Sequence, residues 1–199
     1  MAFTMGSIRQ WHWISASLCM AGMFLFSITG ITLNHAADIS SKPQHISIEG
    51  EVPNTLLQKW VGSETPPSHL SSALYQWLAQ VHDIAIPKSA TGEWDEVEFY
   101  LPLARPGGDA WLAINTETGE FIYEDTDRGW IAFFNDLHKG RDTGIAWVWF
   151  IDVFAAGCII FSFTGLVLLW RQSSGRQSTG PLAALGVLIP LVLILLFVH

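Results

Sequence analysis

Cysteine and basic residues are scarce in this chain, which has two cysteines and ten lysine or arginine residues among 199. Both cysteines, Cys19 and Cys158, fall in apolar stretches, so we expect small packing residues rather than a structural disulfide. The cysteine spacing of zinc sites is absent from the sequence. A glycine-rich phosphate loop and a nucleophile elbow are also absent, which disfavours a nucleotide enzyme.

Three long stretches contain at most one charged residue each. Residues 13–33 and 181–198 contain none, and residues 143–170 contain only Asp152. Each stretch can cross a hydrocarbon layer of about 30 Å as a helix. The sequence therefore predicts an α-helical membrane protein with three transmembrane helices. A cleaved signal peptide is the alternative for the first stretch, but its length and the lack of a clear cleavage site favour a retained helix.

The acidic residues are concentrated between the first two apolar stretches. All of them except Asp152 lie in residues 34–142, and the formal net charge of the chain is −8. Such a segment repels nucleic acid, although it could attract cations such as iron. We expect five parts in this order: N-terminus and helix 1 in 1–35, an α+β domain in 36–136, helix 2 in 137–171, a cytoplasmic loop in 172–180 and helix 3 in 181–199.

The predicted domain contains one helical pattern and several alternating ones. Ser68 as N-cap precedes a helix whose apolar positions are Leu70, Leu74, Trp77, Leu78 and Val81. The residues expected on the buried face of a strand are Val97, Phe99, Leu101 and Leu103. "AWLAINTETGEFIYED" predicts two strands joined by a turn, and "DRGWIAFFNDLHKG" predicts a short amphipathic helix. We expect one helix against a two- or three-stranded antiparallel sheet, after a first third rich in turn formers.

Three of the seven histidines border the predicted membrane helices. His12 opens the first apolar stretch and His35 closes it, so a continuous helix separates them by about 35 Å and one protomer cannot ligate one metal with both. His35 and His138 border the same side, and two neutral imidazoles at one level suit axial haem ligation. Polar residues at an interface are the other interpretation. The remaining histidines are expected to be isolated surface residues: His45, His69, His82 and His199.

Other polar residues near these helices have two open interpretations each. Lys139 and Arg141 could pair with haem propionates, or Asp136 and Asp142 could neutralise them. Asp152 within a span should face protein or water, because a charged group there costs about 2.5–3.5 kcal/mol. Ser27 or Thr29 lies at a suitable depth to bind it. Its role is then either a polar contact between helices or proton transfer.

Two segments resemble a known family. They are "WHWISASLCMAGMFLFSITGITLNH" and "LHKGRDTGIAWVWFIDVFAAGCIIFSFTGLVLLW", and both look like the PepSY-associated transmembrane (PepSY-TM-like) family. "INTETGEFIYED" resembles the PepSY-type module found between the spans of such proteins. The family includes haem-containing ferric and ferric-siderophore reductases of the bacterial inner membrane. The resemblance implies a cytoplasmic N-terminus and a periplasmic PepSY-like domain, an orientation that basic residues at the helix ends do not fix.

The resemblance places the family's membrane-edge histidines at His12, His35 and His138. This chain has three predicted spans, whereas the larger members have four or more, so His12 lacks a histidine partner at its own level unless two protomers pair. We expect a haem b protein with one or two haems per protomer, or haems shared across a homodimer. It would pass electrons from an unknown donor to ferric iron or a ferric chelate. The alternative is a non-enzymatic accessory protein whose PepSY-type domain binds a peptide or a partner protein.

Overall fold

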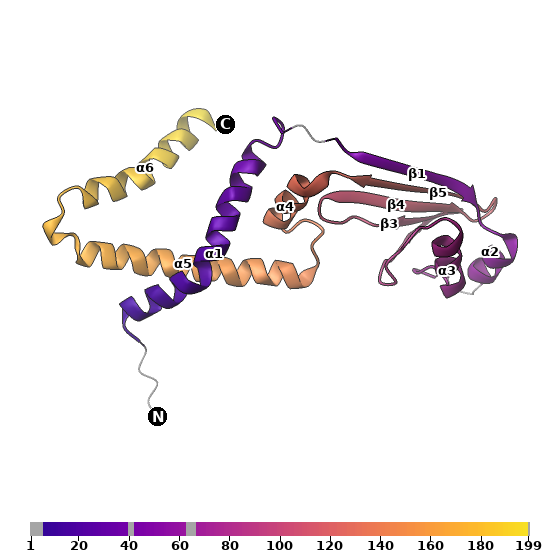
Figure 1. The fold of residues 1–199 in the computed structure, drawn as a ribbon, viewed down its shortest axis with the longest axis horizontal. Helices are drawn as coiled ribbons and strands as arrows, with labels where there is room; N and C mark the ends of the chain where they lie inside the picture. The colour runs from indigo at the N-terminus through magenta and orange to yellow at the C-terminus, as the bar shows by residue number, and fades with distance from the viewer. Residues whose placement is uncertain (1–5, 40–41, 63–66, 199) are drawn as a thin grey trace, which may run out of the picture. The chain divides into compact units, whose positions relative to one another are not determined.

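A computed structural model describes residues 6–39, 42–62 and 67–198 of the chain, so His199 lies outside the described residues. Three helices are long and apolar enough to cross a membrane: α1 (Ile8–Asn34), α5 (Ile145–Arg171) and α6 (Thr179–Phe197). This agrees with the three predicted spans (Figure 1). The contacts divide the chain into two units, one formed by residues 1–27 and 149–199 and the other by residues 28–148, and each is described by itself.

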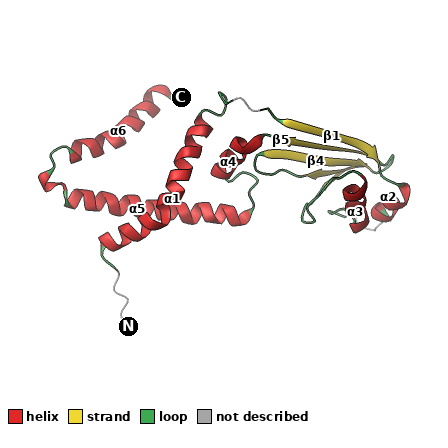
Figure 2. Ribbon diagram, viewed as in Figure 1, coloured by secondary structure: helices red, strands yellow, loops and turns green. Residues whose placement is uncertain are grey.

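The second unit contains a five-stranded antiparallel sheet (Figure 2). Its order is β1-β5-β4-β3-β2, and the strands are β1 (Gln44–Glu51), β2 (Glu93–Asp95), β3 (Glu98–Pro102), β4 (Gly108–Asn115) and β5 (Glu120–Asp127). The predicted hairpin of β4 and β5 is confirmed, but the sheet is larger than the two or three strands expected. Strand β1 was missed because its segment is rich in turn formers and largely exposed. Pairing with β5 along its whole length supplies its backbone hydrogen bonds.

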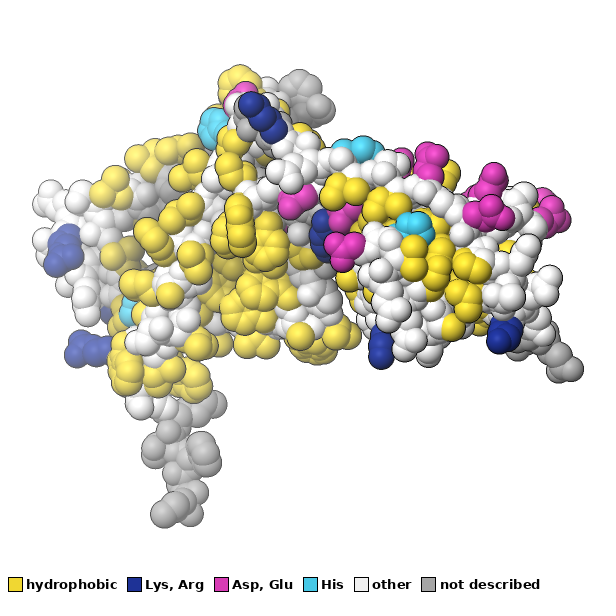
Figure 3. All heavy atoms as spheres, turned by 45° about the vertical axis from the view of Figure 1, so that its right-hand side comes forward, with side chains coloured by type: hydrophobic (Ala, Val, Ile, Leu, Met, Phe, Trp, Pro, Cys, Tyr) yellow, Lys and Arg dark blue, Asp and Glu magenta, His cyan; other side chains and the backbone are white. Residues whose placement is uncertain are grey.

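Two helices, α2 (Asn54–Val61) and α3 (Ser72–Val81), cover one face of the sheet (Figure 1). Alternation along β3 and β4 places side chains such as Phe99 and Leu112 against them. The buried core consists of Val52, Leu57, Trp60, Leu70, Leu74, Leu78, Ile84, Phe99, Leu101, Leu112, Ile114 and Phe121. Acidic side chains gather on the outer surface of this sheet domain, whereas hydrophobic side chains cover the three candidate spans (Figure 3).

Two details of the predicted periodicity are wrong. Ser71 rather than Ser68 caps α3, because its hydroxyl accepts a hydrogen bond from the Leu74 backbone N–H at 3.3 Å. Val81 and Val97 are exposed rather than buried. Val81 is the last residue of α3, and Val97 lies in the turn between β2 and β3.

Truncation of Phe99 tests whether the sheet domain is packed as described. Its side chain is fully buried and its ring meets Trp60 edge-on, with centroids 4.9 Å apart. We expect Phe99→Ala to lower the free energy of unfolding by about 3–5 kcal/mol, since it leaves a cavity in the core. Val97→Ala, at an exposed neighbouring position, is the control and should change stability little. Denaturant unfolding of the full chain measures both, and equal effects of the two substitutions would contradict this packing.

The segment after β5 forms a separate helix, α4 (Gly129–Lys139), rather than the start of the second span. Gly140, Asp142 and Gly144 all have positive φ, and α5 begins at Ile145. His138 therefore belongs to α4, and no continuous helix joins it to Asp152. The short helix predicted from "DRGWIAFFNDLHKG" is confirmed, whereas helix 2 does not extend to residue 137.

In the first unit, small residues allow α1 and α5 to approach each other. A Cβ added to Gly157 would lie 2.7 Å from the Cys19 sulfur, and one added to Gly22 would overlap the Phe154 ring. Both cysteines are free, and Cys19 is fully buried at this contact, as expected of a small apolar packing residue. Helix α6 differs, because none of its described residues is buried.

Candidate functional site

His138 lies against the last turns of α1. Its Nδ1 atom is 2.7 Å from the Thr29 hydroxyl oxygen, and the side chain is half-buried. The next residue of α1 is Gly30, and a Cβ added there would lie 3.7 Å from His138 Cε1. Thr29 and Gly30 thus provide a polar partner and a small surface for the imidazole.

A second polar contact holds the same two helices together. The Thr32 hydroxyl donates a hydrogen bond of 2.8 Å to the side-chain oxygen of Asn135, which is buried. Thr29 and Thr32 are one turn apart on α1, and Asn135 and His138 are one turn apart on α4. The two contacts fix the register of α4 on α1, and this register positions the His138 ring.

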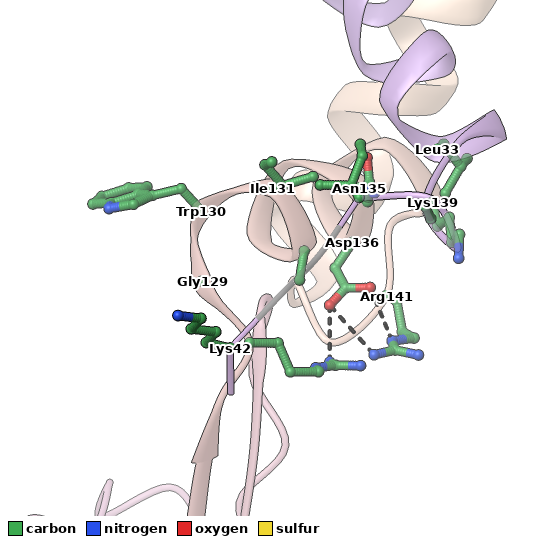
Figure 4. A pocket seen from close by; sticks show the side chains of 13 residues that line it. Leu33, Lys42, Gly129, Trp130, Ile131, Asn135, Asp136, Lys139 and Arg141 are labelled. Carbon is green, nitrogen blue, oxygen red and sulfur yellow. Dashed lines mark hydrogen bonds and ion pairs between the residues drawn. The ribbon is translucent and has the colours of Figure 1, made fainter. Parts of the chain in front are cut away.

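Asp136, the neighbour of Asn135, is a buried carboxylate with three partners from different segments (Figure 4). It accepts hydrogen bonds from the Gly107 N–H at 2.9 Å, from Arg128 at 3.0 Å and from Arg141, whose Nε lies at 3.2 Å. Gly107 precedes β4, Arg128 precedes α4 and Arg141 follows α4. The carboxylate therefore joins the sheet to both ends of α4.

His12 has a comparable environment in the first unit. Its Nδ1 atom is 3.1 Å from the Thr164 hydroxyl oxygen and 3.2 Å from the Phe161 carbonyl oxygen. Its ring stacks on Phe161, with centroids 4.8 Å apart. A Cβ added to Gly165 would lie only 3.1 Å from His12 Cε1, so glycine makes room for the imidazole. The Thr164 hydroxyl donates to the Ile160 carbonyl at 2.7 Å, which leaves its oxygen as an acceptor for His12.

The two sites share a Thr-Gly dipeptide, at Thr29-Gly30 on α1 and at Thr164-Gly165 on α5. In each case Nδ1 of a half-buried histidine meets the threonine hydroxyl, and the ring lies beside the glycine. The positions of His12 and His138 at the ends of apolar stretches marked them as candidate residues, but their contacts with these dipeptides were not predicted. Two Thr-Gly pairs inside apolar stretches were the signal available in the sequence.

His35 lies in a different environment. Its side chain is 57% exposed, and Nδ1 is 3.2 Å from the Asp38 carboxylate. His35 and His138 therefore have different Nδ1 partners, and axial ligation by this pair stays a prediction. Within the described parts of the chain, no group of three or more His, Cys, Asp or Glu side chains could hold a metal ion.

Arg141 and Lys139 differ in their ion pairs. Arg141 pairs with Asp136 and approaches Asp142 at 3.6 Å, the two acids that the second interpretation named, and its contact with a haem propionate stays a prediction. Lys139 is exposed and has no ion pair among the described residues. Its contact with a haem propionate stays a prediction.

Asp152 is exposed on α5, and no hydrogen bond to its side chain is found among the described residues. Ser27, one of its two predicted partners, instead donates to the Met23 carbonyl at 2.7 Å. Thr29, the other, contacts His138. A polar partner for Asp152 must therefore come from a second protein chain or from water if α5 crosses a membrane.

The histidines of the sheet domain have ordinary local partners. His45 Nδ1 lies 3.0 Å from the Thr126 hydroxyl on the exposed pair of β1 and β5. His69 Nδ1 lies 2.8 Å from the Ala90 carbonyl, and His82 packs edge-on against Phe121. None of the three belongs to a group of three or more candidate metal ligands among the described residues.

Asp125 organises a separate charged cluster in the sheet. It raises the pKa of Arg105 by accepting a hydrogen bond of 2.6 Å from the guanidinium group. Burial raises the pKa of Tyr123, whose hydroxyl donates to the same carboxylate at 3.2 Å. Arg105 therefore stays charged and Tyr123 neutral near pH 7, which fits a structural role for the cluster.

A family model described as "Putative PepSY_TM-like" matches residues 3–199. The chain belongs to this family. No curated protein and no solved structure matches it. This match confirms the predicted resemblance to the PepSY-TM-like family over almost the whole chain, including His12 and α6. The likeness to ferric reductases stays a prediction.

Proposed function

We propose that the chain is a membrane protein that binds haem b and passes electrons to ferric iron or a ferric chelate. The observation that carries the proposal is the shared arrangement of His12 and His138 beside a Thr-Gly pair. Metal-ligating histidines almost always hydrogen-bond through the ring nitrogen that does not bind the metal. A histidine fixed through Nδ1 can present Nε2 to an iron atom.

The environment of His12 defines its tautomer. Phe161 offers a carbonyl oxygen, and the Thr164 hydroxyl hydrogen is directed to the carbonyls of Ile160 and Phe161. Both oxygen atoms near Nδ1 of His12 therefore accept a hydrogen bond from it. A neutral His12 therefore carries its proton on Nδ1 and its lone pair on Nε2. This is the form in which imidazole ligates a metal, so the residue fits haem ligation.

In this proposal His138 and His35 are ligands near the sheet domain, and His12 is a ligand at the other end of α1. The ligand sets come from one protomer or are exchanged between two. Haem b, when bound, supplies one-electron transfer. The chain's own residues fix the imidazoles: Thr29 orients His138, Thr164 orients His12, and Asp38 lies beside His35. The acidic sheet domain would attract ferric iron to its side of the membrane.

Membrane insertion, the inner membrane and a periplasmic sheet domain belong to the same proposal. Helices α1, α5 and α6 have the length and hydropathy of spans.

Homodimerisation would cover surfaces that the single chain leaves open, since Asp152 is exposed and no described residue of α6 is buried. Crosslinking in nanodiscs should therefore give dimers, and monomer alone would argue against the dimer.

An optical spectrum of purified full-length protein tests the proposal. We expect a haem b spectrum that changes on reduction and is reoxidised by a ferric chelate, with one or two haems per protomer. The haem-to-protein ratio distinguishes these stoichiometries. Protein expressed with sufficient haem that stays colourless would overturn the proposal.

A peptide- or protein-binding accessory role is the second candidate. Edge strand β1 favours it, because in the described chain β1 pairs with β5 alone and its other edge can take a further strand. Ile46, at the middle of β1, is 54% exposed. This role predicts colourless protein that retains a specific peptide. Substitution of an exposed β1 residue by proline should then abolish peptide retention.

A further inference from the structure

A pocket beside the last turn of α1 contains an unusual share of the chain's basic residues. We define the basic pocket by the four cations that line it: Lys42, Arg128, Lys139 and Arg141. The whole chain has only ten lysine and arginine residues and a formal net charge of −8. The pocket measures about 570 Å³, which is within the usual range for small-molecule sites.

The charges in the basic pocket are not balanced by its single acid. Asp136 pairs with both Arg128 and Arg141, and Asp142, outside the pocket, approaches Arg141 at 3.6 Å. The positive charges of Lys42 and Lys139 are left without a carboxylate partner among these acids. Both lysines are exposed, and neither has an ion pair among the described residues. Figure 4 shows them at opposite ends of the pocket, on either side of Asp136. The pocket therefore carries a net positive charge and favours an anionic ligand.

Apart from Asn135, the remaining side chains of the pocket are apolar and belong to elements at the end of candidate span α1. Leu33 is in the last turn of α1, and Ile39 follows that helix. Trp130 and Ile131 from α4 are 76% and 44% exposed. Phe134, on the same helix, is 47% exposed. A short helix with exposed Trp, Ile and Phe beside basic residues is typical of a helix at the membrane interface.

We infer that the basic pocket binds the phosphate of an anionic phospholipid, with Lys42 and Lys139 as its charged contacts and Trp130 and Ile131 beside the acyl chains. An ionised phosphate with a hydrocarbon body matches both halves of the lining. A soluble phosphate would use only the basic half. The inference depends on the membrane insertion proposed above, but not on haem.

Lipid retention by the full-length protein in detergent tests this inference. Native mass spectrometry compares phosphatidylglycerol with phosphatidylcholine of the same acyl chains. We expect preferential retention of phosphatidylglycerol, and affinity about fivefold lower in Lys42→Gln and in Lys139→Gln. Lys59→Gln, which alters an exposed lysine on α2 outside the pocket, is the matched control and should behave like the unaltered protein.

Three outcomes would overturn the inference. Equal retention of the two lipids would remove the anionic preference, and unchanged affinity in both pocket variants would place the lipid elsewhere. Complete displacement of phosphatidylglycerol by millimolar inorganic phosphate would identify a free-phosphate site. The haem content of Lys139→Gln is measured in parallel, because loss of haem with full lipid retention assigns this lysine to a propionate instead. Flotation of the chain with vesicles tests membrane insertion separately.

Discussion

If the chain binds haem as proposed, His138→Ala is expected to lose the haem placed near the sheet domain. The side chain is the proposed axial ligand, and alanine offers no replacement. Thr29→Val keeps the histidine but removes the hydroxyl 2.7 Å from its Nδ1 atom. Loss of such an outer contact weakens metal affinity by about 10–100-fold. The haem-to-protein ratio after purification measures the first effect, and haem titration of the stripped protein measures the second.

His45→Ala is a control matched in chemistry. His45 also meets a threonine hydroxyl through Nδ1, at 3.0 Å from Thr126, but on an exposed sheet edge. Its substitution should leave the haem ratio unchanged. His35→Ala should resemble His138→Ala if the two residues ligate one iron. Full haem occupancy in both His35→Ala and His138→Ala would refute the ligand assignment while leaving His12 to be tested alone.

Asp136→Ala is expected to destabilise the sheet domain and α4 about as strongly as Phe99→Ala. The carboxylate is buried and accepts hydrogen bonds from Arg128, Arg141 and the Gly107 N–H. Its removal leaves two guanidinium groups close together without their shared acid. Removing one side of a buried ion pair costs about 3–5 kcal/mol. Denaturant unfolding of the full chain, followed by tryptophan fluorescence, measures the loss.

Asp142→Asn is the matched control, because Asp142 approaches Arg141 at 3.6 Å but is more exposed than Asp136. Its backbone has φ of 56°, a conformation that asparagine tolerates. A half-exposed ion pair of this kind contributes about 0–1 kcal/mol. Asp136→Asn should lie between the two, since its amide oxygen can still accept from Gly107. Equal stability of all three variants would contradict the role of Asp136 as the junction.

Patterns within single elements predicted much of the fold. Three long stretches with at most one charged residue each predicted the candidate spans, and alternation around Phe99 and Leu101 predicted part of the sheet. Strand β1 was not predictable in this way, because its hydrogen bonds come from β5, which lies far away in the sequence. The break before α5 was also missed. It depends on positive φ at Gly140, Asp142 and Gly144, and such a turn was not inferred from the predicted second span.

The candidate site was predicted in its residue types but not in its contacts. His12, His35 and His138 stood out because polar residues at span ends are conspicuous. Their partners could not be derived, since hydrogen bonds between helices depend on register rather than on composition. The pairing of Thr29 with His138 is an example, because the sequence predicted Thr29 only as a possible partner of Asp152. Asp136 was considered as a counter-ion of the basic residues, and its bond to Gly107 was not foreseen.

The Asp136 junction has a mechanical consequence. The backbone of Gly107, just before β4, is bonded to Asp136, and the adjacent Asn135 is bonded to α1. His138 lies about one turn beyond Asn135 on the same short helix. Force or strain applied to the β3–β4 turn therefore reaches the His138 ring through a single rigid helix. A molecule that binds the sheet near Gly107 is therefore expected to change the orientation of the His138 imidazole without contacting that side chain.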